Sequence, residues 1–224
     1  MTRRLYLFDI DGTLISTGGA GSGAMRAAFS ALWGVADGFA AVEFSGRSDR
    51  AILRDALVAA GPGDGAFADH LRRFKRAYFR RLPGSLAAHA GTVLPGVVPF
   101  LDALSADADA TLCLGTGNFR ASAAMKLRHF GIDGYFGAGG GFGDRAEDRA
   151  RLVAEGIAAA NRRFGRHTRT FVIGDTPHDV RAARANGAVA VGVSTGTATA
   201  AELAAAGADL VLADLVGADT SFGR

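Results

Sequence analysis

Short apolar segments alternate along this chain with longer segments in which apolar residues recur at helical spacing. Five of the short segments have the length and composition of buried strands: residues 5–9, 110–115, 169–174, 188–193 and 208–212. Between the second and third of these, Asn118 and Gly131 would bound a helix. Its inner face would carry Ala123, Leu127 and Phe130. Such alternation predicts βαβ units and therefore an α/β fold with a parallel sheet.

Two later helices carry clear start signals. Thr176 followed by Pro177 forms an N-cap with proline in the first turn, and Gly187 would end that helix. Thr199 and Glu202 have the spacing of a capping box. These signals place a helix after the third and the fourth expected strand, as parallel pairing requires.

Residues 16–92 interrupt this alternation, because they contain no expected strand. Three amphipathic helices are predicted there from apolar stripes: Met25, Phe29, Leu32 and Trp33; Ile52, Leu53, Ala56 and Leu57; Phe67, Leu71, Phe74 and Tyr78. Residues 61–63 would end the second helix, and Pro83 with Gly84 the third. We therefore expect a helical cap over residues 16–92, inserted into an α/β core formed by residues 1–15 and 93–224.

Two acidic residues, Asp9 and Asp11, stand at the end of the first expected strand. Residues i and i+2 of an extended segment point to the same side, so both carboxylates can face one substrate. Gly12 lets the backbone turn away immediately. Open parallel sheets bind ligands at the carboxyl ends of their strands. We therefore expect a site here, with a cation or a reacting group that offsets the two charges.

Further polar residues follow the later strands. Thr116, Gly117 and Asn118 come at the end of the second strand, and Asp175 and Asp179 come after the third. The carboxyl ends of parallel strands lie at one edge of a sheet, so these groups would join the acidic pair of the first strand.

The order of these motifs resembles that of the haloacid dehalogenase superfamily, in particular its phosphoglycolate phosphatase-like phosphatases with a helical cap. The motifs are Asp-x-Asp-Gly-Thr from Asp9, the strand-end Thr116, a basic residue, and Gly-Asp-x-x-x-Asp from Gly174. Residues 94–97, Leu-Pro-Gly-Val, are similar to the family's return from cap to core. The resemblance covers nearly the whole chain. It implies a Rossmann-like, doubly wound sheet and Mg²⁺-dependent phosphatase chemistry.

The resemblance assigns roles to the acidic residues. It implies that Asp9 is the nucleophile that forms an aspartyl-phosphate, and that Asp11 alternates as proton donor and acceptor. It implies a Mg²⁺ site made of the Asp9 carboxylate, the Asp11 backbone carbonyl, Asp175 and water, with Asp179 as a further candidate. Asp179 also lies at the third position of the helix capped by Thr176, where a carboxylate is favourable without any metal.

Other residues are implied to bind substrate. Thr116, with the backbone amides near Gly117 and Asn118, would hold phosphate oxygens at a helix N-terminus. In the cap, Gly46 and Arg47 lie in a segment that resembles the family's specificity loop. Arg47 could reach a substrate carboxylate or a second phosphate.

The third motif departs from the family pattern, which usually has a lysine there. Residues 143–152 contain no lysine. Arg149, a catalytic candidate that follows the glycine-rich loop of residues 139–143, is the first choice to replace it, and Arg145 is the second. Arginine keeps the charge and adds bidentate phosphate geometry, although Arg149 could equally be a solvated helical residue. Lys126 is expected to lie away from the site, because it comes two turns into its helix.

We therefore predict a Mg²⁺-dependent phosphatase that hydrolyses a small phosphorylated metabolite through an aspartyl-phosphate. A sugar-phosphate mutase of the same superfamily would share every core residue and differ in its cap and product. A phospho-accepting signalling receiver also gathers acidic residues, a threonine and a basic residue at strand ends, but lacks an inserted cap. A non-catalytic binding protein that kept the fold is a further alternative, favoured only by the missing lysine.

Composition narrows the classes of partner. The chain has 224 residues, 49% hydrophobic and 21% charged, which is typical of a globular protein. Its 25 basic and 22 acidic residues give a net charge of +3, which is weak evidence for a polyanionic partner. The basic residues of the third cap helix are expected to form a solvated face rather than a nucleic-acid surface. With a single cysteine, Cys113, and no apolar run of membrane length, we expect a cytoplasmic protein without a membrane partner.

Overall fold

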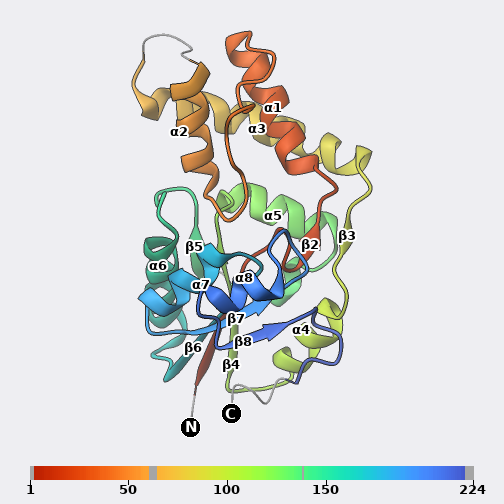
Figure 1. Cartoon of the computed structure of the whole chain (residues 1–224), viewed down its shortest axis with the longest axis vertical. Helices are drawn as coiled ribbons and strands as arrows, with labels where there is room; N and C mark the ends of the chain where they lie inside the picture. Colours follow the sequence, from red (N-terminus) through yellow and green to blue (C-terminus); the bar gives the residue numbers. More distant parts are fainter. Residues whose placement is uncertain (1–2, 61–64, 138, 220–224) are drawn as a thin grey trace.

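A parallel six-stranded sheet forms the centre of the computed structural model, which describes residues 3–60, 65–137 and 139–219 (Figure 1). Its strand order is β5-β4-β1-β6-β7-β8, and every neighbouring pair is parallel. The strands are β1 (Arg4–Phe8), β4 (Ala110–Thr116), β5 (Gly140–Phe142), β6 (Arg169–Gly174), β7 (Val189–Val193) and β8 (Leu210–Leu212). The predicted α/β fold is confirmed, and all five expected strands are present.

Helices cover both faces of this sheet because its central strand is apolar on both sides. Leu5 and Leu7 of β1 pack into one apolar cluster, and Tyr6 and Phe8 into another. The first cluster includes residues from α6 (Arg149–Phe164), α7 (Pro177–Ala185) and α8 (Ala200–Ala205). The second includes residues from α4 (Val97–Ser105) and α5 (Arg120–His129), beside the short helix η1 (Asp133–Tyr135). The sheet is therefore doubly wound, as expected.

Three helices form a separate layer beyond the carboxyl ends of the strands: α1 (Ala20–Trp33), α2 (Asp49–Ala60) and α3 (Phe67–Ala88) (Figure 1). They share one apolar cluster, which also takes in Phe119 from the core. The two chain crossings between the layers pair with each other as antiparallel strands β2 (Ile15–Ser16) and β3 (Thr92–Val93). Residues 16–92 were expected to contain no strand, but one residue of each of these strands lies in that range.

The third cap helix was predicted to end at Pro83 and Gly84, but it continues to Ala88. Leu82 and Leu86 are buried against the other cap helices. Apolar packing of this kind outweighs the loss of one helical hydrogen bond at a proline, which costs about 3 kcal/mol. Residues 61–63, which were expected to end the second helix, lie outside the described residues.

The helix after β4 begins two residues later than predicted. Asn118 does not cap it; Phe119 is the N-cap residue and α5 starts at Arg120. The capping signals that open α7 and α8 were correct, since Thr176 and Thr199 both form capping boxes.

The glycine-rich segment of residues 139–143 was predicted to be a loop but contains the edge strand β5, paired in parallel with β4. Glycine suits this strand because α6 lies directly against it. A Cβ at Gly141 would lie 2.1 Å from the backbone oxygen of Leu152, and one at Gly156 would lie 2.9 Å from the Gly141 nitrogen. Local composition therefore favoured a loop, while the close contact with α6 favours a strand with glycine at two of its three positions.

Within the described residues, no helix is long and apolar enough to cross a bilayer.

The contact between β5 and α6 predicts a specific sensitivity to side-chain addition. Gly141→Ala should lower the free energy of unfolding by about 1–3 kcal/mol, because the new methyl group must displace backbone. Gly134→Ala is the matched control, since a Cβ there meets nothing within 4 Å. Urea unfolding would measure both. Equal stability of the two variants would contradict this description of the sheet edge.

Candidate active site

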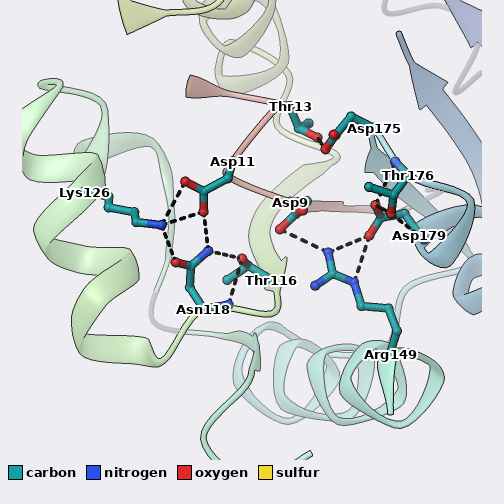
Figure 2. Close-up of polar contacts among 10 residues, drawn as sticks. All are labelled: Asp9, Asp11, Thr13, Thr116, Asn118, Lys126, Arg149, Asp175, Thr176 and Asp179. Carbon is teal, nitrogen blue, oxygen red and sulfur yellow. Dashed lines mark hydrogen bonds and ion pairs between the residues drawn. The ribbon is translucent and has the colours of Figure 1, made fainter. Parts of the chain in front are cut away.

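Three adjacent strands end at one point and deliver the polar residues of the site. Asp9 follows β1, Thr116 ends β4 and Asp175 follows β6 (Figure 2). Strand β1 lies between the other two, and the chain continues outwards from β4 to β5 on one side and from β6 to β7 on the other. Such switch points are where open α/β sheets bind ligands. A cavity of about 310 Å³ opens here between the core and the cap.

Asp9, Asp175 and Asp179 form a compact, buried acidic cluster. One carboxylate oxygen from each lies within 4.8 Å of the others. Burial is the main cause that raises the pKa of Asp9. Burial also raises the pKa of Asp175 to about 8, and the neighbouring carboxylates of Asp9 and Asp179 add to that shift. Thr13 donates a hydrogen bond to Asp175 Oδ1 at 2.9 Å. A divalent cation would offset the negative charge of these carboxylates, whose oxygens are the kind of ligand that Mg²⁺ prefers.

The oxygens of this cluster are not equally free. Asp179 Oδ1 accepts from Arg149 Nε at 2.8 Å, and its Oδ2 accepts from the Thr176 hydroxyl at 2.6 Å. Its two alternative roles therefore coexist: it completes the capping box of α7 and it borders the acidic cluster. Asp9 and Asp175 are the carboxylates that fit a Mg²⁺ ion most readily, and Asp179 holds the arginine beside them.

Arg149 is buried in the site and is not a solvated helical residue. Its Nη2 lies 3.0 Å from Asp9 Oδ1 and 2.5 Å from Asp179 Oδ1. Burial alone would lower its pKa, but the Asp179 and Asp9 carboxylates more than compensate and raise it. Neither contact is aligned as a hydrogen bond at Nη2, so among the described residues this group keeps uncommitted N–H donors. Arg145, the second choice, is exposed and lies outside this cluster.

Lys126 was expected to lie away from the site, and that expectation is wrong. Its Nζ lies 2.6 Å and 2.8 Å from the two carboxylate oxygens of Asp11 and 2.7 Å from Asn118 Oδ1 (Figure 2). Asn118 Nδ2 in turn donates to Asp11 and to Thr116. The Asp11 side chain is therefore held towards α5 and away from the acidic cluster.

Lys126 reaches the site because a helical side chain leans back towards the N-terminus of its helix. Lys126 is six residues beyond Arg120, so its backbone lies only about 9 Å along the helix. The long side chain covers the remaining distance, and Gly21 of α1 leaves room for it, since a Cβ there would lie 3.1 Å from Nζ. The signal was present in the sequence, because Lys126 neighbours Ala123 and Leu127 on the face expected to be buried.

The turn after β4 combines a buried hydroxyl with a close contact to the cap. Thr116 is fully buried, and Asn118 donates to its hydroxyl at 2.9 Å. A Cβ at Gly117 would lie 2.3 Å from the backbone oxygen of Arg47. This turn leads directly into the N-terminal end of α5, a favourable place for phosphate oxygens.

The two cap residues predicted to bind substrate both border the cavity. Gly46 has φ of +67°, and a Cβ there would lie 2.7 Å from the Thr176 hydroxyl, so this segment is pressed against the core. Arg47 is not free, because its guanidinium pairs with Asp55 of α2. Any contact between Arg47 and substrate must compete with that ion pair.

Asp49, at the start of α2, also borders the cavity, although it was not among the site residues predicted from the sequence. Its Oδ2 accepts from the Phe119 backbone nitrogen at 2.8 Å and from the Ser122 hydroxyl at 3.2 Å. Burial raises its pKa to about 6, and Lys126 opposes that shift. An acidic residue in the first turn of a helix is common, so nothing in the sequence separated Asp49 from ordinary capping.

Comparison with known proteins agrees on one family. The family model described as haloacid dehalogenase-like hydrolase matches residues 4–187. The curated protein "Probable phosphatase IndB" of Dickeya dadantii (strain 3937) is 30% identical over 227 residues, covering 96% of this chain and 92% of that protein.

Two solved structures share the fold. A predicted phosphoglycolate phosphatase of Haemophilus somnus 129PT has a TM-score of 0.70 and 19% identity, with 96% of each chain covered. CbbY of Rhodobacter sphaeroides, solved in complex with phosphate, has a TM-score of 0.61 and 20% identity, covering 96% of this chain and 95% of that one.

The acidic cluster predicts that metal-free stability depends on pH. The pKa of Asp175 is about 8 in the folded chain instead of 3.8. A raised carboxyl pKa contributes stability that is fully present below about pH 4 and lost as the pH rises through about 8. Thermal unfolding in EDTA should therefore occur at a lower temperature at about pH 8.5 than at about pH 6, and Mg²⁺ should stabilise most at the higher pH.

Asp175→Asn should weaken both the pH dependence and the stabilisation by Mg²⁺. Asp69→Asn on the exposed side of α3 is the control and should leave both unchanged. Differential scanning fluorimetry measures these shifts. If Mg²⁺ stabilises Asp175→Asn as strongly as the unmodified protein, the metal does not bind at this cluster.

Proposed function

This chain belongs to the haloacid dehalogenase-like hydrolases, and on that premise we propose that it is a Mg²⁺-dependent phosphatase acting on small phosphate monoesters. The observation that carries the proposal is the position of Asp9. Its carboxylate lies at the floor of the cavity, beside two further carboxylates and the guanidinium of Arg149. A dianionic phosphate can approach a carboxylate nucleophile only where cations offset both charges.

Asp9 is the proposed nucleophile. Its oxygen attacks phosphorus, the bond from phosphorus to the ester oxygen breaks, and an aspartyl-phosphate forms on Asp9. Thr116 and the amides of the following turn hold the equatorial phosphate oxygens, while the uncommitted N–H donors of Arg149 neutralise them. When bound by Asp9, Asp175 and the backbone carbonyl of Asp11, Mg²⁺ supplies additional positive charge to the phosphoryl group.

Asp11 is the proposed proton carrier. It gives a proton to the departing alcohol oxygen and then accepts one from the water that hydrolyses the aspartyl-phosphate. Its side chain is 41% exposed, and it borders the cavity where the alcohol would lie. Lys126 and Asn118 hold that side chain in one orientation before substrate arrives.

The direct test is hydrolysis of an aryl phosphate with and without Mg²⁺. Asp9→Asn should lose at least about a thousandfold in kcat/KM, and EDTA should abolish turnover of the unmodified protein. Release of inorganic phosphate would distinguish a phosphatase from a mutase, which returns an isomerised phosphosugar. Activity that survives both EDTA and Asp9→Asn would rule out the proposed mechanism.

Arg149 provides a second prediction. Arg149→Ala should lower kcat roughly a hundredfold or more, because Asp9 and Asp179 then face the phosphate without a local cation. Arg149→Lys should recover part of that loss, since the charge returns without the planar geometry. Arg145→Ala, at the exposed neighbour, is the control. Steady-state kinetics in which Arg149→Ala matches this control would show that a different group neutralises the phosphate.

A further inference from the structure

Asp49 is a buried carboxylate for which the proposed reaction provides no role. It lies at the N-terminal end of α2, in contact with the start of α5, and is only 7% exposed. Its Oδ2 accepts hydrogen bonds from Phe119 and Ser122 at the start of α5. Among the described residues, Oδ1 has no hydrogen-bond partner, and it is not one of the fully enclosed orphan atoms. Because Asp49 borders the cavity, this second oxygen is available there.

Among the described residues Asp49 has no direct ion-pair partner, and Lys126 acts on its charge only from beyond ion-pair distance. Three cations border the same cavity, and each is paired: Lys126 with Asp11, Arg47 with Asp55, and Arg149 with Asp9 and Asp179. Asp175 borders it too and belongs to the cluster suited to a metal. Within the described part of the chain, Asp49 takes part in no ion pair. The side of the cavity bordered by the cap therefore holds a carboxylate that no cation contacts among the described residues.

The neighbouring walls strengthen the effect of that charge. Met25, Ile52 and Tyr78 border the same cavity as Asp49, and all three are buried. A charged group in such surroundings loses its hydration, which raises the pKa of Asp49 to about 6 and leaves it ionised near neutral pH. A cation brought in by a ligand would restore the lost solvation and is attracted more strongly than in water.

We propose that the cavity selects phosphate monoesters whose alcohol carries an ammonium group, and that the Asp49 carboxylate receives that group while the phosphate lies at Asp9. The inference rests on the proposed phosphatase function and specifies its substrate class. The expectation that Arg47 binds a second anion stays a prediction, and such a contact would have to compete with the ion pair between Arg47 and Asp55. Asp49 acts here as a specificity-determining residue and takes no part in breaking the ester bond.

The experiment compares esters that differ only in the charge at the far end of the alcohol. Aminoethyl, aminopropyl and aminobutyl phosphate are each paired with the neutral alkyl phosphate of equal length and with the corresponding carboxyalkyl phosphate. At about pH 8, the best ammonium ester should have a kcat/KM roughly tenfold above its neutral partner, the size expected for one ion pair in a desolvated site. The carboxylated ester should be the poorest of each set.

Asp49→Asn tests the assigned residue, since its side-chain oxygen can still accept from Phe119 and Ser122. The ratio of ammonium to neutral ester should fall to about one, while hydrolysis of the neutral ester is retained. Asp69→Asn, on the exposed side of α3, is the matched control and should keep the full ratio. An unchanged ratio in Asp49→Asn, or a preference of the unmodified protein for neutral or carboxylated esters, would overturn the proposal.

A binding measurement keeps the inference independent of catalysis and of variant folding. Aminoalkyl phosphonates cannot be hydrolysed as esters, and the unmodified protein should bind them about tenfold more tightly than alkyl phosphonates of equal length by calorimetry. Equal affinities would overturn the substrate class. Failure to hydrolyse any ester would instead contradict the proposed phosphatase function, so the two failures are distinguishable.

Discussion

Asp9, Asp175 and Asp179 are buried within 4.8 Å of one another, so their surroundings must offset both the lost hydration and the mutual repulsion of their charges. Like charges at this spacing cannot all ionise without nearby cations. Arg149 meets part of that requirement from the start of α6, and a divalent cation can meet the rest. The positive charge that offsets these carboxylates is also what the proposed phosphate substrate would need during transfer. The close approach of buried carboxylates therefore underlies both the pH-dependent stability that we predict and the phosphate binding that we propose.

The closed arrangement of cap and core depends on residues without side chains. Gly12 turns the chain away from Asp9, with φ of +83°, and a Cβ there would lie 2.4 Å from Asp175. Gly46 and Gly117 sit where the cap loop presses on the turns after β4 and β6. These contacts bring the cap and the core together at the border of the cavity. Reduced access of water there would strengthen the charge interactions inside it. Backbone proximity thus sets the electrostatics on which the chemistry depends.

The sequence was sufficient where a local pattern and the fold agreed. The apolar strands and the capping boxes at Thr176 and Thr199 each have a strong local signal, and the structure confirms them. Helix α3 continues through Pro83 because distant apolar contacts decide its length. Gly141 lies in a strand because α6 approaches it closely. In both cases the deciding partner lies far away in the sequence.

The same distinction separates the site residues. Asp9, Thr116 and Asp175 were placed together by the rule that parallel strands end at one edge. Asp49 borders the cavity from a helix whose packing no local pattern reports, whereas the sequence placed Lys126 on a buried face without showing how far its side chain reaches. The position of Arg149 in the sequence made it a candidate, but its burial could not be predicted, because that follows from the contact of α6 with the strand ends. The sequence gives the charge of each site residue, whereas only the tertiary structure shows in which direction its side chain points.

The pairing of β2 with β3 has a consequence for how this architecture can vary. Ser16 and Thr92 face each other across that pair, so the long inserted segment leaves and returns through neighbouring points. An insertion whose ends touch places no demand on the spacing of the strands below it. The core can therefore keep its acidic cluster unchanged while the inserted helices are lengthened, exchanged or remodelled for another alcohol. In the function that we propose, selectivity and bond-breaking would lie in two parts of the chain that can vary separately.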